Sequence, residues 1–424
     1  MRSNYKKLGP YIRQVVVKNK SLEVDKLLGV SITKEFIPSI ANTVGTDMSK
    51  YKIVRTNQFA YGPVTSRNGD KISVALLKDE DCIISTSYTV FEIIDTNKLL
   101  PEYLMMWFRR PEFDRYARHM SHGSVRELFG WEEMCDVELP VPSPEKQRKI
   151  VKEYHTIVNR IKLNEQLNRK LEETAQAIYK QWFVDFEFPI SAKYAAAIGK
   201  PELEGKPYKS SGGEMEYNDE LDQEIPKGWD VSSLGDLGTI KGGKRLPKGE
   251  TLVPEKTEYP YIKVADLGKF KYTILNQGFE YLPENVRQKI SRYIVSAGDL
   301  VISIVGTIGI VRIIHDSLDK ANLTENCAKV TKIKKITADY LYHYFYSRYG
   351  QNELKMRIVG GVQGKLPLYN IASFSVICPG FKEIELFIKM IEKINVNQKT
   401  HLREVVSLED MRRVLLAKMT QMAA

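Results

Sequence analysis

The sequence is poor in the residues that build disulfide and metal sites. It has only four cysteines in 424 residues, and each stands alone. We predict buried thiols in a reducing, cytoplasmic compartment rather than disulfides or a zinc site. The four are Cys82, Cys135, Cys327 and Cys378. His119 and His122 form an HxxH pair, but no further ligands follow at a defined spacing, so a helix end at the surface is favoured over a metal site.

Long apolar runs and catalytic motifs are missing as well. The longest apolar run, Leu300 to Val311, has 12 residues and two glycines, whereas a bilayer span needs about 20. The first residues, MRSNYKKLGPYI, lack the apolar region of a signal peptide. We find no G-x-S-x-G and no Asn/Asp-Pro-Pro-aromatic motif. A soluble protein without its own catalytic residues, metal or cofactor is therefore expected.

The net charge is +10, but it is unevenly distributed. Residues 185–224 carry four Lys/Arg and ten Asp/Glu, so the rest of the chain is more basic than the total suggests. Basic folded domains favour a polyanionic partner such as DNA. Charge alone also fits an ordinary solvated surface.

Part of the chain is repeated at a spacing of 237 residues. PEYLMMWF from Pro101 matches ADYLYHYF from Ala338, and the match continues for about 80 residues. Two copies are too few for a solenoid, so they favour a pseudo-twofold molecule, which suits duplex DNA. The interiors of the copies differ, so we predict that they read two different sequences.

Each copy is predicted to be a mixed α/β (α+β) domain followed by a long helix. Residues 53–64 and 293–314 have the apolar pattern of strands, and 100–118 and 338–355 that of short amphipathic helices. Residues 185–224 are rich in Gly, Pro, Ser and acids, which is typical of a connector. The predicted segments are globular domains 1–143 and 225–380, spacer helices 144–184 and 381–424, and the connector 185–224.

The two long segments have heptad spacing over more than four heptads, which predicts coiled-coil helices of about 54 Å. Each apolar seam is polar at mid-length, with Asn164 and Asn168 in the first copy and Gln398 and His401 in the second. These residues would set the register of a two-helix coil, or a partner's helix enters there. We favour the first interpretation.

Two kinds of loop are candidate DNA contacts. Gly238–Arg245 is close to a Walker A loop, but Arg245 stands where magnesium binding needs Ser or Thr. We predict phosphate contacts from Lys241, Lys244 and Arg245, with a plain surface turn as the alternative. The second kind is the pair of Gly-rich loops at equivalent places in the repeat, 121–126 and 360–365. Their Arg, Lys and Gln side chains are suited to base edges. A structural turn explains them equally well. The remaining candidates are Ser66, Arg67, His122, Ser124, Arg126, Thr307, Gly361, Gln363 and Lys365.

Several segments resemble the specificity subunit of type I restriction–modification systems. The most specific is LNRKLEETAQAIYKQWFVDFEFPI from Leu167, which continues through GKPYKSSGGEMEYNDELDQEIPKGW from Gly205. LEDMRRVLLAKM from Leu408 and GDLVISIVGTIG from Gly298 are also similar to family members. The helix entry Pro144-Glu145-Lys146-Gln147 is close to the family pattern, whereas the second copy departs from it.

The resemblance implies that the globular parts are target-recognition domains, each reading half of a bipartite, asymmetric DNA site. The two helices would pack antiparallel as a spacer. Two methyltransferase subunits with S-adenosylmethionine would dock on the helical regions, and ATP- and magnesium-dependent restriction subunits would join them. Predicted partner contacts are Leu167, Leu171, Ile178, Leu408 and Leu415. A stand-alone DNA-binding regulator and a protein-binding scaffold are the alternatives from residue pattern alone.

Overall fold

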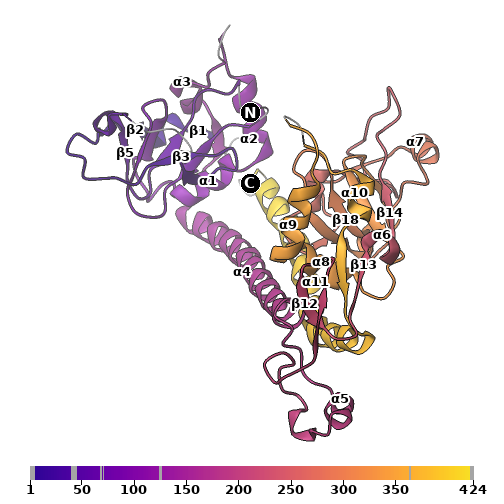
Figure 1. Cartoon of the computed structure of the whole chain (residues 1–424). Coiled ribbons are helices and arrows are strands. Elements are labelled where there is room, and N and C mark those ends of the chain that lie inside the picture. The colour runs from indigo at the N-terminus through magenta and orange to yellow at the C-terminus, as the bar shows by residue number, and fades with distance from the viewer. Residues whose placement is uncertain are drawn as a thin grey trace. The chain divides into compact units, whose positions relative to one another are not determined.

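The chain folds as two compact units, each mixed in helix and strand (Figure 1). The computed structural model describes residues 5–39, 45–66, 69, 71–123, 127–361 and 364–420. The first unit comprises residues 1–160 and 408–424, and the second comprises residues 161–407. Each therefore contains one predicted globular domain together with parts of both long helices.

An antiparallel four-stranded sheet organises the first unit. Its order is β2-β9-β6-β7, with β2 Ile12–Gln14, β6 Phe59–Tyr61, β7 Val74–Leu76 and β9 Thr89–Ile93. Phe59 and Phe91 stack with ring centroids 4.8 Å apart, and Phe108 meets both edge-on. The remaining elements are β1 Tyr5–Lys7, β3 Leu28–Val30, β4 Phe36–Pro38, β5 Lys52–Val54, β8 Cys82–Ile84, α1 Pro101–Phe108, α2 Pro111–His119, α3 Trp131–Cys135 and β10 Glu138–Pro140.

The second unit contains a larger, mixed sheet of order β14-β21-β18-β19-β16, in which the edge strand β16 pairs parallel with β19 and the other pairs are antiparallel. Its strands are β14 Thr239–Gly242, β16 Tyr272–Thr273, β18 Leu300–Ser303, β19 Val311–Ile314 and β21 Cys327–Thr331. A second, three-stranded sheet consists of β15 Pro260–Ile262, β17 Glu280–Tyr281 and β20 Asn322–Leu323, which lie in sequence between strands of the main sheet. The other elements are α5 Ala192–Ala197, β11 Met215–Asn218, β12 Gln223–Pro226, β13 Asp230–Ser233, α6 Leu234–Leu237, α7 Glu284–Lys289, α8 Ala338–Tyr346, α9 Arg348–Arg357, α10 Leu368–Ala372 and β22 Ser375–Cys378.

The repeat seen in the sequence is also a repeat of contacts. The first strand of each domain pairs antiparallel with the last, β1 with β10 and β13 with β22. Tyr103 and Tyr340, 237 residues apart, each donate a hydrogen bond from the phenol to the carbonyl oxygen of that last strand, Pro140 and Ile377, at 3.1 and 2.9 Å. The two domains therefore share a frame, as the sequence predicts.

The two long helices are α4, Pro144–Phe183, and α11, Phe381–Lys418. In the second unit they run antiparallel, because Asn168 faces His401 whereas Trp182, further along α4, faces Phe387. Tyr179, Phe183 and Phe387 close this contact with ring centroids 5.0 to 6.0 Å apart. In the first unit, Tyr154 of α4 and Leu415 of α11 are buried in one core.

The structure corrects two sequence predictions. Residues 185–224 are not an open connector: they include α5, β11 and the start of β12, and Phe188 stacks on Tyr208 and Trp229 at 4.6 and 5.0 Å. The single helices predicted at 100–118 and 338–355 are each two helices, α1 with α2 and α8 with α9. Seven of the eight residues of α1 are buried, so it is a core helix rather than an amphipathic one.

Candidate nucleic-acid interface

Four loops of the second domain meet at one end of its main sheet. They follow β14, connect β18 to β19, precede β21, and connect α9 to α10. The amide of Ile304 donates to the carbonyl oxygen of Asn326 at 2.8 Å, and the amide of Leu366 donates to the carbonyl oxygen of Ile304 at 2.9 Å. Backbone hydrogen bonds therefore hold loops from distant parts of the sequence together.

The loop between α9 and α10 is closed at its base by main-chain bridges. Val359 and Lys365 exchange two N–H···O bonds of 2.9 Å, and Lys365 also bridges Val305 of the β18–β19 loop. Because these bonds use only main-chain atoms, they hold the base of the loop whatever its side chains are.

The first domain has the same arrangement. His122 and Leu128 exchange two N–H···O bonds of 3.1 and 2.9 Å, and Leu128 also bridges Val64. Leu128 precedes Lys365 by 237 residues, so the two loops are equivalent members of the repeat. We call each bridged set a loop clamp: Val64, His122 and Leu128 in the first domain, and Val305, Val359 and Lys365 in the second.

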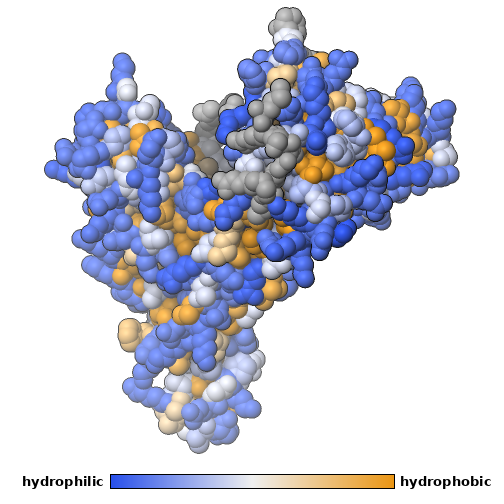
Figure 2. Space-filling view, turned by 180° about the vertical axis from the view of Figure 1, so that it is seen from behind, coloured by the Kyte–Doolittle hydropathy of each residue, from blue (hydrophilic) through white to orange (hydrophobic). Residues whose placement is uncertain are grey.

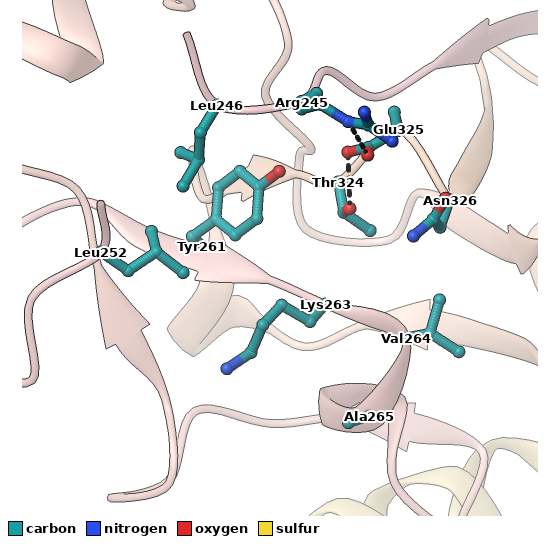
Figure 3. A pocket seen from close by; sticks show the side chains of 10 residues that line it. All are labelled: Arg245, Leu246, Leu252, Tyr261, Lys263, Val264, Ala265, Thr324, Glu325 and Asn326. Carbon is teal, nitrogen blue, oxygen red and sulfur yellow. Dashed lines mark hydrogen bonds and ion pairs between the residues drawn. The ribbon is translucent and has the colours of Figure 1, made fainter. Parts of the chain in front are cut away.

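A pocket of about 460 Å³ opens beside the loops of the second domain (Figure 3). Tyr261 and Lys263 reach it from β15 and the residue after it, and Thr324, Glu325 and Asn326 from the loop before β21. The remaining lining residues are Arg245, Leu246, Leu252, Val264 and Ala265. The phenol of Tyr261 donates to the carbonyl oxygen of Lys244 at 2.8 Å, which holds the loop after β14 against the pocket.

An ion pair lies on one side of this pocket. Arg245 Nε donates to Glu325 Oε1 at 2.7 Å, while the guanidinium side chain stays 79% exposed. Burial alone would raise the pKa of the Glu325 carboxyl, but hydrogen bonds from Arg245, the backbone and Thr324 outweigh it, so that pKa is lowered. Glu325 is therefore ionised at neutral pH and orients Arg245 at the pocket edge, where its other guanidinium donors reach solvent.

The Gly-rich segment Gly238–Arg245 is largely a strand rather than a nucleotide-binding loop. Thr239–Gly242 form β14, paired with β21, so the turn begins only at Gly243. A Cβ on Gly243 would lie 2.1 Å from the carbonyl oxygen of Thr324, so this close passage of two chains requires glycine. The Walker-like interpretation therefore fails in the backbone as well as at Arg245.

Most of the predicted DNA contacts that the structure describes lie on the loop ends and are exposed. In the second domain these are Lys244, Arg245, Thr307, Gly361 and Lys365, together with Lys241 on β14. In the first domain Ser66 and His122 are exposed; Ser66 follows Thr65, whose hydroxyl donates to Ser121 Oγ at 2.8 Å. Arg67, Ser124, Arg126 and Gln363 lie outside the described residues.

Four residues at the pocket carry chemistry that sequence reasoning missed. They are Tyr261, Lys263, Glu325 and Asn326. Asn326 is half-buried and its main chain is held by the sheet, which presents its amide at the pocket. Only the short polar run NLTEN between two apolar segments marked this loop in the sequence.

The predicted partner contacts differ in their exposure. Leu167 is exposed, Leu171 and Leu408 are half-buried, and Ile178 packs against the core of the second unit. Leu415 is buried in the core of the first unit, so its prediction as a surface contact is wrong. Heptad position alone did not separate the helix face that packs inside the chain from the face that remains open.

Two further observations concern the described ranges alone. No helix among them is long and apolar enough to cross a membrane. Nor do three His, Cys, Asp or Glu side chains gather there as a metal site requires. Cys82, Cys327 and Cys378 are buried, and burial raises the pKa of the Cys82 and Cys327 thiols to about 12, as expected for core thiols, whereas Cys135 is only half-buried.

The fold and the loop clamps define a chain made of two copies of one recognition module. The family model "Type I restriction modification DNA specificity domain" matches residues 10–173 and again residues 226–402. The chain therefore belongs to the family of type I restriction–modification DNA specificity proteins, and its two copies of the domain confirm the repeat.

Named relatives agree with this assignment. The specificity subunit of the type I restriction enzyme MjaIX from Methanocaldococcus jannaschii is 32% identical over 186 residues, which cover 44% of this chain and 38% of the relative. The HindI specificity subunit from Haemophilus influenzae is 23% identical over 409 residues, covering 87% and 86%. The crystal structure of the type I S subunit from M. genitalium has the same fold, with a TM-score of 0.51 at 15% identity, covering 98% of this chain and 95% of the other.

Proposed function

We propose that this chain recognises a bipartite, asymmetric double-stranded DNA site as the non-catalytic specificity subunit of a type I restriction–modification complex. The observation that carries the proposal is the pair of loop clamps. Both are closed by the same pattern of main-chain bridges, but different residues form them. Each domain would read one half-site with the residues of its own clamp. The exposed Lys244, Arg245 and Lys365 would contribute phosphate or base contacts in the second half.

The catalytic work would belong to partners. Two methyltransferase subunits carrying S-adenosylmethionine would dock on the long helices, and restriction subunits using ATP and magnesium would complete the cytoplasmic complex. Apolar side chains left open on the helices of the second unit support such docking, since Leu163, Leu167 and Met390 are 43%, 39% and 49% exposed. The face shown in Figure 2 is largely hydrophilic, with apolar side chains interspersed among the polar ones.

Genome-wide methylation mapping tests the proposal. The chain and its neighbouring methyltransferase subunit would be expressed in a host that lacks such a system. A single adenine-methylated motif with two unlike halves is the expected result. No motif from two co-purifying proteins would contradict it and favour the scaffold alternative.

Direct binding to duplex DNA separates the remaining alternatives. DNA-binding through phosphates loses affinity steeply with salt. Salt-sensitive binding by the chain alone, with no methylation when the partner is present, would identify a stand-alone regulator.

A further inference from the structure

Lys271 has a fully buried ammonium group in the second unit. Its side chain is 0% exposed, and Nζ lies 2.7 Å from Asp339 Oδ1, 2.8 Å from Asn395 Oδ1 and 3.4 Å from His343 Nε2. A lysine has three N–H donors, so each donor has an acceptor here. Asn395 completes the set by donating from Nδ2 to Asp339 Oδ1 at 3.1 Å.

The network continues from Lys271 into both long helices. His343 Nδ1 lies 2.8 Å from Gln176 Oε1 of α4, and Gln176 Nε2 donates back to the carbonyl oxygen of His343 at 3.1 Å. With Nδ1–H donating to Gln176, Nε2 of a neutral imidazole is the acceptor for Lys271. Glu172 of α4 accepts from Gln398 Nε2 of α11 at 2.9 Å and lies 3.6 Å from His343 Nδ1.

Four elements therefore meet in one polar network: the residue before β16 in the recognition sheet, α8, α4 and α11. The main chain of Lys271 is itself tied to the sheet, because its carbonyl oxygen accepts from the amide of Ile313 at 2.9 Å. The recognition domain and the two spacer helices are thus joined by directional bonds, in which Lys271 links the sheet to α8 and α11 and, through His343 and Gln176, to α4.

The surrounding contact is aromatic and apolar. Tyr340 and Phe387 pack there against Tyr179, with ring centroids 5.3 and 6.0 Å from that of Tyr179. Apolar burial is non-directional and tolerates small rotations and slides, whereas hydrogen bonds weaken steeply with angle. A buried ion pair adds little net stability compared with apolar residues of the same volume. Fixing one geometry is therefore the main effect expected of the Lys271 network.

The first domain offers a natural comparison. Glu102, the repeat equivalent of Asp339, pairs with Lys78, whose side chain is 42% exposed. Met106 stands at the position equivalent to His343. The lysine that pairs with the Glu102 carboxylate is thus partly exposed, so Lys78 supplies a control for the buried Lys271.

We propose that Lys271 is a positioning residue that fixes the second recognition domain on the two-helix spacer and thereby sets the gap between the two half-sites. This inference rests on the proposed function. One base-pair step is about 3.4 Å along the duplex, so a small rotation or slide of one domain on the spacer is enough to admit a neighbouring gap length.

The test is methylation mapping of Lys271→Met in the full chain with its methyltransferase subunit. Unchanged half-sites are expected, with methylation at gaps one base pair longer or shorter rising from background to about a tenth of the native-gap level, as for a geometry disfavoured roughly tenfold. Lys78→Met is expected to keep one gap. A variant that lost activity only by unfolding would methylate less DNA, but at unchanged half-sites and at the native gap alone.

A second variant guards against misfolding. Lys271→Met with Asp339→Leu removes both charges, so the half-buried Asp339 carboxylate is not left without its cation. If this double variant melts like the wild type and still methylates a single gap at the wild-type level, the proposal is overturned. The wild-type chain tests the proposed function separately. If it methylates no bipartite motif, that function is refuted, and the inference with it. If every variant methylates a single gap, only the role of Lys271 is refuted.

Discussion

His401 Nδ1 of α11 lies 2.9 Å from Asn168 Oδ1 of α4. Polar seam residues of the two long helices therefore pair with each other. Asn168 also donates from Nδ2 to the carbonyl oxygen of Gln398 at 3.4 Å. This pairing agrees with a register-setting role in a two-helix coil.

Asn164, one turn before Asn168, is 0% exposed, and neither its amide oxygen nor its nitrogen has a hydrogen-bond partner among the described residues. An unsatisfied buried amide costs about 1–3 kcal/mol. We predict that Asn164→Leu raises the free energy of unfolding by about 1 kcal/mol, measured by denaturant melts. Asn168→Leu is the control: it leaves His401 without its partner and should lower stability. An equal gain from both changes would contradict this assignment.

Lengthening the spacer should change the gap alone. We predict that seven residues inserted into both α4 and α11, at the level of Asn168 and His401, add about 10 Å of helix and lengthen the recognised gap by about three base pairs. Matched insertions keep the antiparallel seam in register, whereas an insertion in α4 alone would misalign it and serves as the control. Methylation mapping reads the result, and an unchanged gap in the doubly lengthened chain would count against the spacer role.

Exchanging residues 1–143 for the first domain of another family member should change one half-site only. The reason is that each loop clamp is closed within its own domain. The same mapping experiment measures the outcome, and exchange of 225–380 is the reciprocal control. A change in both halves after a single exchange would show that the domains do not read independently.

Acid should weaken the second unit through His343. Burial, and then the charge of Lys271, hold the pKa of His343 well below its ordinary value, which is about 6.5. Below that pH the unfolded chain takes up a proton that the folded chain does not, so the free energy of unfolding falls as pH decreases from about 7. We predict a smaller loss of melting temperature between pH 7 and 6 in His343→Met than in the wild type.

Two other groups shape the same pH profile. His315 has a pKa lowered by burial and by Arg403, and it remains in the variant, so the acid sensitivity should shrink without vanishing. Burial raises the pKa of Glu172, so its effect has the opposite sign: the folded state binds that proton first, and stability is gained as pH falls through the raised pKa. The measurement should therefore compare slopes above pH 6, and an unchanged slope in His343→Met would contradict the prediction.

The long helices and the repeat were predictable because their signals are local or periodic. Heptad spacing placed α4 and α11, and the spacing of 237 marked the Gly-rich loops of the two copies as equivalent. The folded state of 185–224 was not predictable, because Phe188 is buried by Tyr208 and Trp229, which follow it by 20 and 41 residues. Composition describes such a segment as a linker until its aromatic partners are known.

The candidate site divides in the same way. Lys244, Arg245 and Lys365 could be predicted as site residues because they are basic residues in glycine-rich loops. Lys263 and Asn326 could not, because they reach the pocket only when separate strands fold together. Leu415 shows the converse error, because a heptad position predicts an apolar contact without saying whether this chain or another fills it.

The loop clamps have a consequence for how new specificities can arise. Each is closed through main-chain atoms of Val64, Leu128 and His122, or of Val305, Lys365 and Val359. Substitutions inside the enclosed loop change none of the main-chain atoms that make those bonds. Under the proposed function, the preference for bases can therefore drift, one half-site at a time, within an unchanged frame.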